Sequence, residues 1–318
     1  MEIIAQKATR LDKLLQEHLS QPRNQVENFI KTHGVMVDGK EIFKCGLKLK
    51  GGENIIYTLP KSEKTKAQKI DFDIEIIYED EDVLVLNKPP HLVVHPAPSV
   101  KEPTLVDWLI HKGISLSTLS GEERHGIVHR IDKETSGALV IAKNNDAHIH
   151  LSKQLENRSM GRYYLALIDL PLKEDIIVDK PIGRNPANRT KMAVVNSGRE
   201  AKSAFVKLSQ SPSKNYELIA AKLFTGRTHQ IRVHLESLSR HIIYDFTYGF
   251  KKKRDIISRV MLHAYMIYFI HPKTGELIIK KAPLFGDFEE MLHDNFPLKD
   301  IHEKIDPDYI ISRFDTAF

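Results

Sequence analysis

The segment His129–Gly137 holds the residues whose types and spacing could best carry chemistry. Its sequence is HRIDKETSG, so the carboxylate of Asp132 stands among cations and small hydroxyl residues, directly before an apolar run. A cation beside a carboxylate favours the ionised form, and small residues let a substrate backbone come close. From these residues alone two interpretations stay open: a catalytic acid at the mouth of a cleft, or a turn former or helix cap.

A second candidate segment, Thr225–Leu235, has the sequence TGRTHQIRVHL. We expect a strand at 231–235. Because side chains of a strand alternate between its two faces, Arg232 and His234 would share one face and the aliphatic residues would pack on the other. Arginine stays charged when buried and can bind a carboxylate through two donors. The alternative is a surface salt bridge, which contributes little to stability.

Two pairs of histidines have the spacing of four residues that zinc hydrolases use on a helix. The pairs are His91 with His95 and His125 with His129. Pro96 and Gly126 argue against helices at these places, and the chain has no His-Glu-x-x-His pattern. We therefore expect no metal site.

The composition is that of a globular protein of two domains. The chain has 318 residues, 41% of them hydrophobic, with a net charge of +5 and a sequence pI of about 9.0. This basic balance is compatible with a nucleic-acid partner without proving one. A single cysteine, Cys45, excludes a disulfide within the chain and fits a reducing compartment. The start of the chain lacks the apolar core of a secretion signal, and no apolar run is long enough for a bilayer, so we expect a cytoplasmic protein without membrane contact.

The first 62 residues predict a small helix-hairpin domain. Leucines at helical spacing predict one short helix after residue 10, and a second apolar stripe predicts another that ends near residue 33. Asp38-Gly39 between apolar residues indicates a tight hairpin, and an apolar strand follows at 55–59. The polar, lysine-rich residues after it predict a linker at 63–72.

Residues 73–297 predict a larger domain that is rich in strands. We expect strands at 74–78, 83–86, 138–142, 163–170, 205–208, 216–220, 231–235, 265–270 and 276–279. Helical spacing after residue 145 predicts one helix on this domain. Strands and helices do not alternate regularly, which favours an α+β fold: a mixed, largely antiparallel sheet with flanking helices. We expect a charged tail at 298–318.

Five motifs of this larger domain resemble those of the RluA-type pseudouridine synthases and occur in the same order, from about residue 74 to 292. His129–Gly137 resembles H-R-[LI]-D-x-x-T-S-G, and Gly226–Leu235 resembles G-R-T-H-Q-[IL]-R-V-H-L. The other three are Arg162–Ala166 for basic-x-Tyr-x-Ala, Val85–Pro89 for the strand ending in N-K-P, and 262–264 with 271–275 and 282–283 for the closing strands. Five motifs in order are far more specific than one.

The resemblance implies an isomerase that converts uridine to pseudouridine in structured RNA. Asp132 would be its catalytic carboxylate, Arg232 the salt-bridge partner, and Tyr164 the ring beneath a uracil that has been flipped out of its stack. Three chemical routes stay open, since the carboxylate could attack the sugar, add to the base or remove a ribose proton. The reaction requires no metal, nucleotide or redox cofactor.

The resemblance also implies RNA as the partner, with large-subunit ribosomal RNA as the expected substrate and transfer RNA as the alternative. Arg130, Arg227 and His229 would contact the RNA around the flipped nucleotide. Residues 1–62 resemble the S4-like RNA-binding domain first recognised in a ribosomal protein, and some members of the synthase family carry it before the catalytic domain. Its basic residues Arg10, Lys13 and Arg23 would contact phosphates. We see no sign of an obligate protein partner.

Two positions depart from the family pattern. The segment 243–249 resembles the G-D-x-x-Y-G element, but Tyr244 stands where glycine is usual, and the turn at 21–24 lacks the usual S-R-S run. Two other functions remain to be weighed. A non-catalytic RNA-binding or ribosome-assembly factor would not need Asp132, Tyr164 and Arg232 together. A glycosidase or nuclease would need a second placed carboxylate or a metal cluster.

Overall fold

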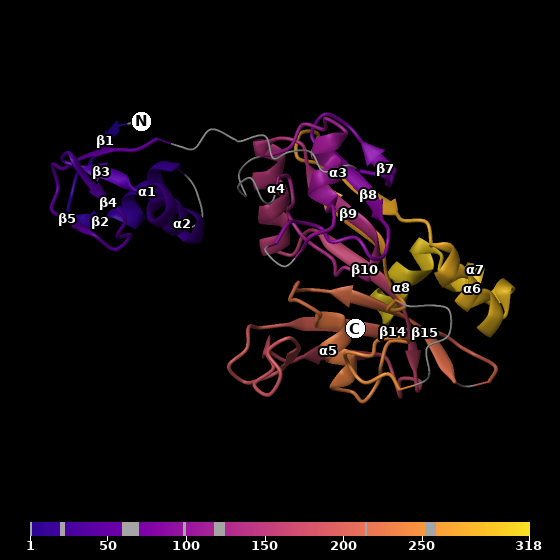
Figure 1. Cartoon of the computed structure of the whole chain (residues 1–318). Helices are drawn as coiled ribbons and strands as arrows, with labels where there is room; N and C mark the ends of the chain where they lie inside the picture. Colours follow the sequence, from indigo (N-terminus) through magenta and orange to yellow (C-terminus); the bar gives the residue numbers. More distant parts are fainter. Residues whose placement is uncertain are drawn as a thin grey trace. The chain divides into compact units, whose positions relative to one another are not determined.

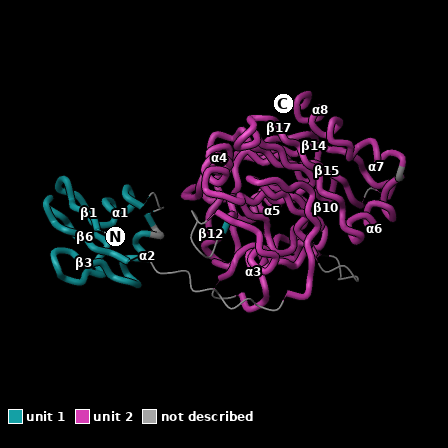
Figure 2. The backbone as a smooth tube through the Cα atoms, turned by 90° about the horizontal axis from the view of Figure 1, so that it is seen from above, with its two compact units in different colours: residues 1–69, 118–125 teal, residues 70–117, 126–318 magenta. Residues whose placement is uncertain are grey.

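The computed structural model describes residues 2–19, 23–58, 70–97, 100–117, 125–213, 215–251 and 259–318. The chain divides into two compact units, residues 1–69 with 118–125 and residues 70–117 with 126–318 (Figure 2). Most of the linker expected at 63–72 lies outside the described residues, as does the start of the turn at 21–24. No described helix is long and apolar enough to span a membrane.

Unit 1 contains the two predicted helices and the predicted hairpin. Its elements are β1 (Glu2–Ile4), β2 (Thr9–Arg10), α1 (Leu11–Leu19), α2 (Arg23–His33), β3 (Val35–Val37), β4 (Lys40–Ile42), β5 (Lys48–Leu49) and β6 (Asn54–Ile56). Four strands form a sheet in the order β1-β6-β3-β4. Asp38 and Gly39 have φ angles of 48° and 77°, the left-handed values that a two-residue hairpin turn requires. Leu11, Leu15 and Ile30 are buried in the core of the unit.

Unit 2 is built on a nine-stranded sheet (Figure 1). In spatial order the strands are β11 (Ile176–Asp179), β14 (Lys202–Gln210), β15 (Tyr216–Leu223), β10 (Gly161–Asp169), β16 (Leu262–Ile270), β9 (Ser136–Ala142), β8 (Val83–Lys88) and β7 (Glu75–Glu79), and β17 (Leu277–Lys281) pairs with β16. Among the described strands of this sheet, only β16 and β9 pair in parallel. The mixed, largely antiparallel α+β fold expected from the sequence is therefore confirmed.

Helices cover both faces of the sheet around β8 and β9. Leu84 and Leu86 pack in one cluster with Trp108 of α3 (Leu105–His111), while Val83 and Val85 pack in another with residues of α4 (Asn145–Glu156). Alternate side chains of a strand point to opposite faces. Burial on both faces explains why the runs 83–86 and 138–142 of these strands are apolar at every position rather than at every second one.

The strand expected at 231–235 is wrong, because these residues belong to helix α5 (Gln230–Glu236). All side chains from 230 to 235 are buried. The alternation of apolar and polar residues therefore does not mark a solvent face and a core face. Arg232 and His234 have different partners: Arg232 binds Asp245, and the ring of His234 contacts Ser203 and the carbonyl of Lys180. A small hairpin of β12 (Ile182–Arg184) and β13 (Met192–Val194) lies in the same cluster as Val233.

The charged tail expected at 298–318 is also wrong. After α6 (Gly286–Asn295) these residues form α7 (Leu298–Lys304) and α8 (Pro307–Ala317), labelled at the yellow end of the chain in Figure 1. Asp306 caps α8 by accepting two backbone hydrogen bonds, and Pro307 occupies its first turn. Ile310 and Phe314, one helical turn apart, are buried in the main core of unit 2. The segment 298–318 is charged in overall composition, so its short apolar stripe is not evident from composition alone.

Replacement of Phe314 by alanine tests the role of α8 in the core. The ring is 4% exposed, so its loss should lower the free energy of unfolding of unit 2 by about 3–5 kcal/mol, measured by urea denaturation. The matched control is Phe318→Ala, at the residue that directly follows α8. Its ring is 49% exposed, and the expected loss of unfolding free energy is below about 1 kcal/mol. An equally small loss of unfolding free energy in both variants would show that α8 does not contribute to the core.

Candidate active site

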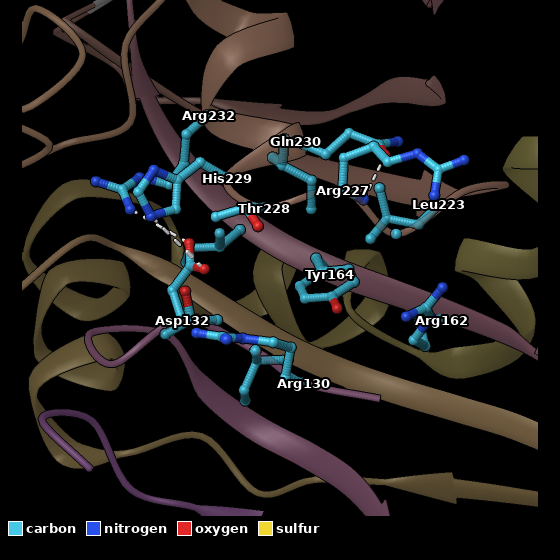
Figure 3. A pocket seen from close by; sticks show the side chains of 15 residues that line it. Arg130, Asp132, Arg162, Tyr164, Leu223, Arg227, Thr228, His229, Gln230 and Arg232 are labelled. Atoms are coloured by element: carbon cyan, nitrogen blue, oxygen red, sulfur yellow. Dashed lines mark hydrogen bonds and ion pairs between the residues drawn. The ribbon is translucent and has the colours of Figure 1, made fainter. Parts of the chain in front are cut away.

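A pocket opens on unit 2 where four segments meet (Figure 3). Its lining comes from residues 130–132 and Thr135 before β9, from Arg162 and Tyr164 of β10, from Leu223 and residues 226–232 up to the first turn of α5, and from Leu262 of β16. Among its described lining residues Asp132 is the only carboxylate. Both candidate segments of the sequence thus supply walls of one pocket.

The loop that carries Asp132 is fastened to the end of β8 by Lys88. The ammonium group of Lys88 is fully buried and donates to the carbonyls of Pro89, Leu92 and Lys133 at 2.7, 2.9 and 3.2 Å. Burial lowers the pKa of Lys88 to about 7, and the charge of nearby Asp132 opposes this shift. Lys88 therefore fixes the backbone one residue after the catalytic candidate.

Arg232 binds two carboxylates at once. Its Nε and Nη2 donate to the two oxygens of Asp245 at 2.7 and 2.9 Å, and its Nη1 donates to Oδ2 of Asp132 at 3.2 Å. The pairing of Arg232 with Asp132 expected from the sequence is therefore confirmed. Burial disfavours the charged guanidinium, but the hydrogen bonds and charge of Asp245, with a further contribution from Asp132, outweigh it and raise the pKa of Arg232.

Helix α5 is set in place by the side-chain amide of Gln230. Its oxygen accepts hydrogen bonds from the hydroxyl of Thr225 and the backbone N–H of Arg227, and its nitrogen donates to the carbonyl of Lys202 and the hydroxyl of Ser203 on β14. These bonds tie the loop, the helix start and the sheet together. Because Arg232 lies in the first turn of α5, these hydrogen bonds of Gln230 also position Arg232.

His229 precedes α5 with a left-handed φ of 57°. Its Nδ1 lies 2.7 Å from the hydroxyl of Tyr248, and its Nε2 lies 3.9 Å from Oδ1 of Asp132. Burial lowers the pKa of His229, so the ring is neutral at neutral pH. The ring of Tyr248 also lies under the guanidinium of Arg232, with 4.9 Å between the guanidinium carbon and the ring centre.

Tyr164 is 4% exposed and lines the pocket from the middle of β10. Its direct neighbours across the sheet are Ala221 and Ala264, and the ladder is irregular between Tyr163 and Tyr164. Paired residues of neighbouring strands point to the same face. The two alanines therefore leave room beside the ring, and burial raises the pKa of its hydroxyl.

The RNA-contact candidates are divided between the two units. Arg130 is exposed, with Nη1 3.4 Å from the ring of His95, and Arg227 donates to the carbonyl of Glu200; both line the pocket. In unit 1, Arg10 and Arg23 bind the buried carboxylate of Asp12, while Lys13 is exposed on α1. Contact of these residues, and of His229, with RNA stays a prediction.

A family model described as RNA pseudouridylate synthase matches residues 82–237 of this chain. An uncharacterized RNA pseudouridine synthase of Helicobacter pylori (strain ATCC 700392 / 26695) is 50% identical over 315 residues, which cover 96% of this chain and 95% of the relative. The chain belongs to the RNA pseudouridine synthase family. It is therefore an isomerase that modifies RNA, as the sequence motifs predict.

Other members of the family agree with this assignment. The ribosomal large subunit pseudouridine synthase D of Nitrosomonas europaea is 36% identical over 292 residues, covering 89% of this chain and 83% of the relative. Among solved structures, human RNA pseudouridylate synthase domain containing 1 has a TM-score of 0.53 at 24% identity, covering 70% of this chain and 94% of that chain. The first supports the RluA-type family, and the second shows the fold.

Two residues of the pseudouridine synthase site are missed by sequence reasoning. Asp245 lies in the segment similar to G-D-x-x-Y-G, and Lys88 lies in the segment similar to N-K-P. Membership in these motifs could have marked both residues as candidates for the site. Neither motif shows what the residue touches. The structure supplies that information by placing Asp245 on Arg232 and Lys88 on the backbone of the Asp132 loop.

Replacement of Asp245 by asparagine tests whether this carboxylate positions Arg232. Loss of one charge of a buried pair should cost about 3–5 kcal/mol of unfolding free energy. It should also slow turnover, because the guanidinium is no longer held toward Asp132. Urea denaturation and single-turnover rates measure the two effects. Asp315→Asn, an exposed carboxylate on α8, is the control and should change stability by less than about 0.5 kcal/mol. Unchanged stability and rate in Asp245→Asn would contradict the positioning role.

Proposed function

We propose that this pseudouridine synthase modifies uridines of large-subunit ribosomal RNA, with Asp132 as its catalytic carboxylate. The observation that carries the proposal is the placement of Asp132 in one pocket with Tyr164, 3.2 Å from the guanidinium of Arg232. Relatives named as large-subunit synthases, such as the protein of Nitrosomonas europaea, support the choice of substrate. Transfer RNA is the alternative substrate.

The geometry fits a flipped uridine. A base within paired RNA is stacked, so the nucleotide must leave the helix to reach the pocket. With the uracil against Tyr164, the bond from ribose to base would lie near Asp132. Arg232 occupies Oδ2 of that carboxylate, and Oδ1 is 3.9 Å from the neutral ring of His229, so Oδ1 remains available to the substrate.

Asp132 serves each chemical route in its ionised form. The carboxylate can attack the sugar, add to the base or remove a ribose proton, and the charge of Arg232 favours the ionised form in every case. A glycosidase would need a second carboxylate in the pocket, and the described lining offers only Asp132. The nearby Asp245 is committed to Arg232 through both oxygens.

Tyr164 acts as the platform for the base. A buried aromatic ring offers a flat apolar surface on which any base can stack. Because burial raises the pKa of its hydroxyl, Tyr164 stays protonated at neutral pH, so it is not a base and is a weaker proton donor than an exposed tyrosine. Arg130, exposed at the pocket, and Arg227 contact the RNA beside the flipped nucleotide.

Unit 1 is proposed as an S4-like domain that binds RNA phosphates. Arg10 and Arg23 flank the buried Asp12, with their side chains 48% and 57% exposed. The carboxylate of Asp12 binds both guanidiniums, and Nε of Arg23 also donates to Glu27. Together with the exposed Lys13 they supply positive charge for a phosphate backbone.

Pseudouridine mapping in total RNA tests the substrate and the catalytic residue together. Cells that lack the gene should lose pseudouridine at specific positions of large-subunit RNA. The wild-type gene should restore them, and Asp132→Asn should not, because only the ionisable oxygen is lost and RNA binding is retained. Loss of pseudouridine from transfer RNA alone would overturn the proposed substrate.

The control for this experiment is Glu134→Gln, which removes a carboxylate two residues from Asp132 and outside the pocket lining. It should restore modification as well as the wild type does. Restoration by Asp132→Asn at equal protein level would contradict the catalytic assignment.

Replacement of Lys13 by glutamine tests RNA binding by unit 1. Loss of one phosphate contact should weaken RNA affinity and lower the slope of log K against log salt by about 0.9. Binding titrations at several salt concentrations measure the slope, and Lys299→Gln, an exposed lysine on α7, is the control. An unchanged slope for Lys13→Gln would exclude that residue as a phosphate contact.

A further inference from the structure

Arg162 is a buried cation for which the described residues supply no partner. Its side chain is 7% exposed, and it takes part in no hydrogen bond or ion pair with the residues that the structure describes. Its Nε is buried and unpaired. The other buried arginines differ, since Arg232 binds Asp245 and Arg259 binds Asp287 through two N–H groups each. Burial of an unpaired charge costs free energy. This cost indicates that Arg162 binds a group from outside the protein.

The side chain of Arg162 belongs to the pocket. It lies two residues before Tyr164 on β10, and both line the same cavity. In the view of Figure 3, Tyr164 lies between Asp132 and Arg162, and the guanidinium points toward the segment that carries Leu223 and Arg227. The charges of Arg162 and Asp132 both act on the hydroxyl of Tyr164, one lowering and one raising its pKa.

Gly226 keeps this part of the wall open. A β-carbon at this position would lie 3.3 Å from Nη1 and 3.4 Å from Nη2 of Arg162. These distances are tight, so a larger residue would press on the guanidinium. The loop can approach the cation without filling the space that a ligand needs.

We propose that Arg162 donates hydrogen bonds to the carbonyl oxygens of the uracil and stabilises the negative charge that they gain during the reaction. The inference rests on the proposed function, which places the ribose at Asp132 and the uracil against Tyr164. The carbonyl edge of the base then faces away from Asp132, on the side where Arg162 lies. An oxygen of the base fits this buried position better than a backbone phosphate, for which the exposed Arg130 is suited.

The charge balance of the reaction explains why a cation is useful there. When the bond between C1′ and N1 breaks, its electron pair stays with the base and is shared by N1 and the two carbonyl oxygens. C5 then bonds to C1′, the proton on C5 is lost, and N1 gains a proton, so the product is an isomer and nothing is oxidised. If Asp132 instead adds to the base first, negative charge also moves onto a carbonyl oxygen. A preplaced donor stabilises either state.

Substitution of Arg162 combined with a fluorinated substrate tests the proposal. The substrate is an RNA that the wild-type chain converts, prepared with uridine or with 5-fluorouridine at the target position. For Arg162→Met the single-turnover rate on uridine RNA should fall about 10²–10³-fold. On 5-fluorouridine RNA, followed by disappearance of the fluorinated nucleoside, the loss should be at least about tenfold smaller, because fluorine itself stabilises negative charge on the base. Arg162→Lys should retain part of the rate.

Measurements of melting temperature and RNA affinity distinguish stabilisation of charge on the uracil from a structural role or a phosphate contact. Because Arg162→Met removes a buried unpaired charge, its melting temperature should equal or exceed that of the wild type, and its RNA affinity should change less than about threefold. Lys222→Met is the control on the neighbouring strand β15, where the ammonium lies over the ring of Tyr163 rather than in the pocket. Its rate should be unchanged.

Three results would overturn the assignment. An unchanged rate in Arg162→Met excludes a role in the reaction. Equal rate losses on both substrates with weaker binding and a lower salt slope identify a phosphate contact, and a large fall in melting temperature identifies a structural role. Failure of the wild-type chain to convert any RNA would instead overturn the proposed function, and the assignment with it.

Discussion

The site depends on the hydrogen bonds that the guanidinium of Arg232 donates to Asp245 and Asp132. One guanidinium holds Asp245 through two parallel hydrogen bonds and has a single Nη1 donor for Asp132. A buried ion pair is stable only when nearly all its donors and acceptors are satisfied. The fixed fork of arginine meets this requirement with two aspartates, which a lysine could not do. The network thereby orients Oδ2 of Asp132 and leaves Oδ1 without a bond to Arg232.

Asp245 is placed by a strained residue. Tyr244 has a left-handed φ of 65°, at the position where the similar element of the family carries glycine. Such a conformation costs a residue with a side chain about 1–2 kcal/mol. The ring of Tyr244 lies 5.5 Å from that of Phe250 and 6.4 Å from that of Phe246, and aromatic contacts of this kind offset much of the cost. The chain thus keeps the backbone that Asp245 requires without the glycine.

The sequence predicted the parts of this protein that are recorded as motifs or as regular spacing. The motifs identified Asp132, Tyr164 and Arg232, and the structure brings these residues into one pocket. The apolar stripes of α1 and α2 and the Asp38-Gly39 turn were predicted correctly because each is a local signal. Helix α5 was not, because its alternating side chains are buried all round and their partners lie on distant segments. The functions of Asp245 and Arg162 follow from which atoms surround them, and no spacing along the chain records this.

A crystal structure of the chain bound to a fragment of its target RNA tests the central claim most directly. The account predicts a uracil stacked on Tyr164, its ribose beside Oδ1 of Asp132, and Nη1 of Arg232 still within hydrogen-bond distance of Oδ2. Arg232 should keep both of its bonds to Asp245 in the complex. A nucleotide bound away from this pocket, or an Asp132 turned out of reach of Arg232, would contradict the account.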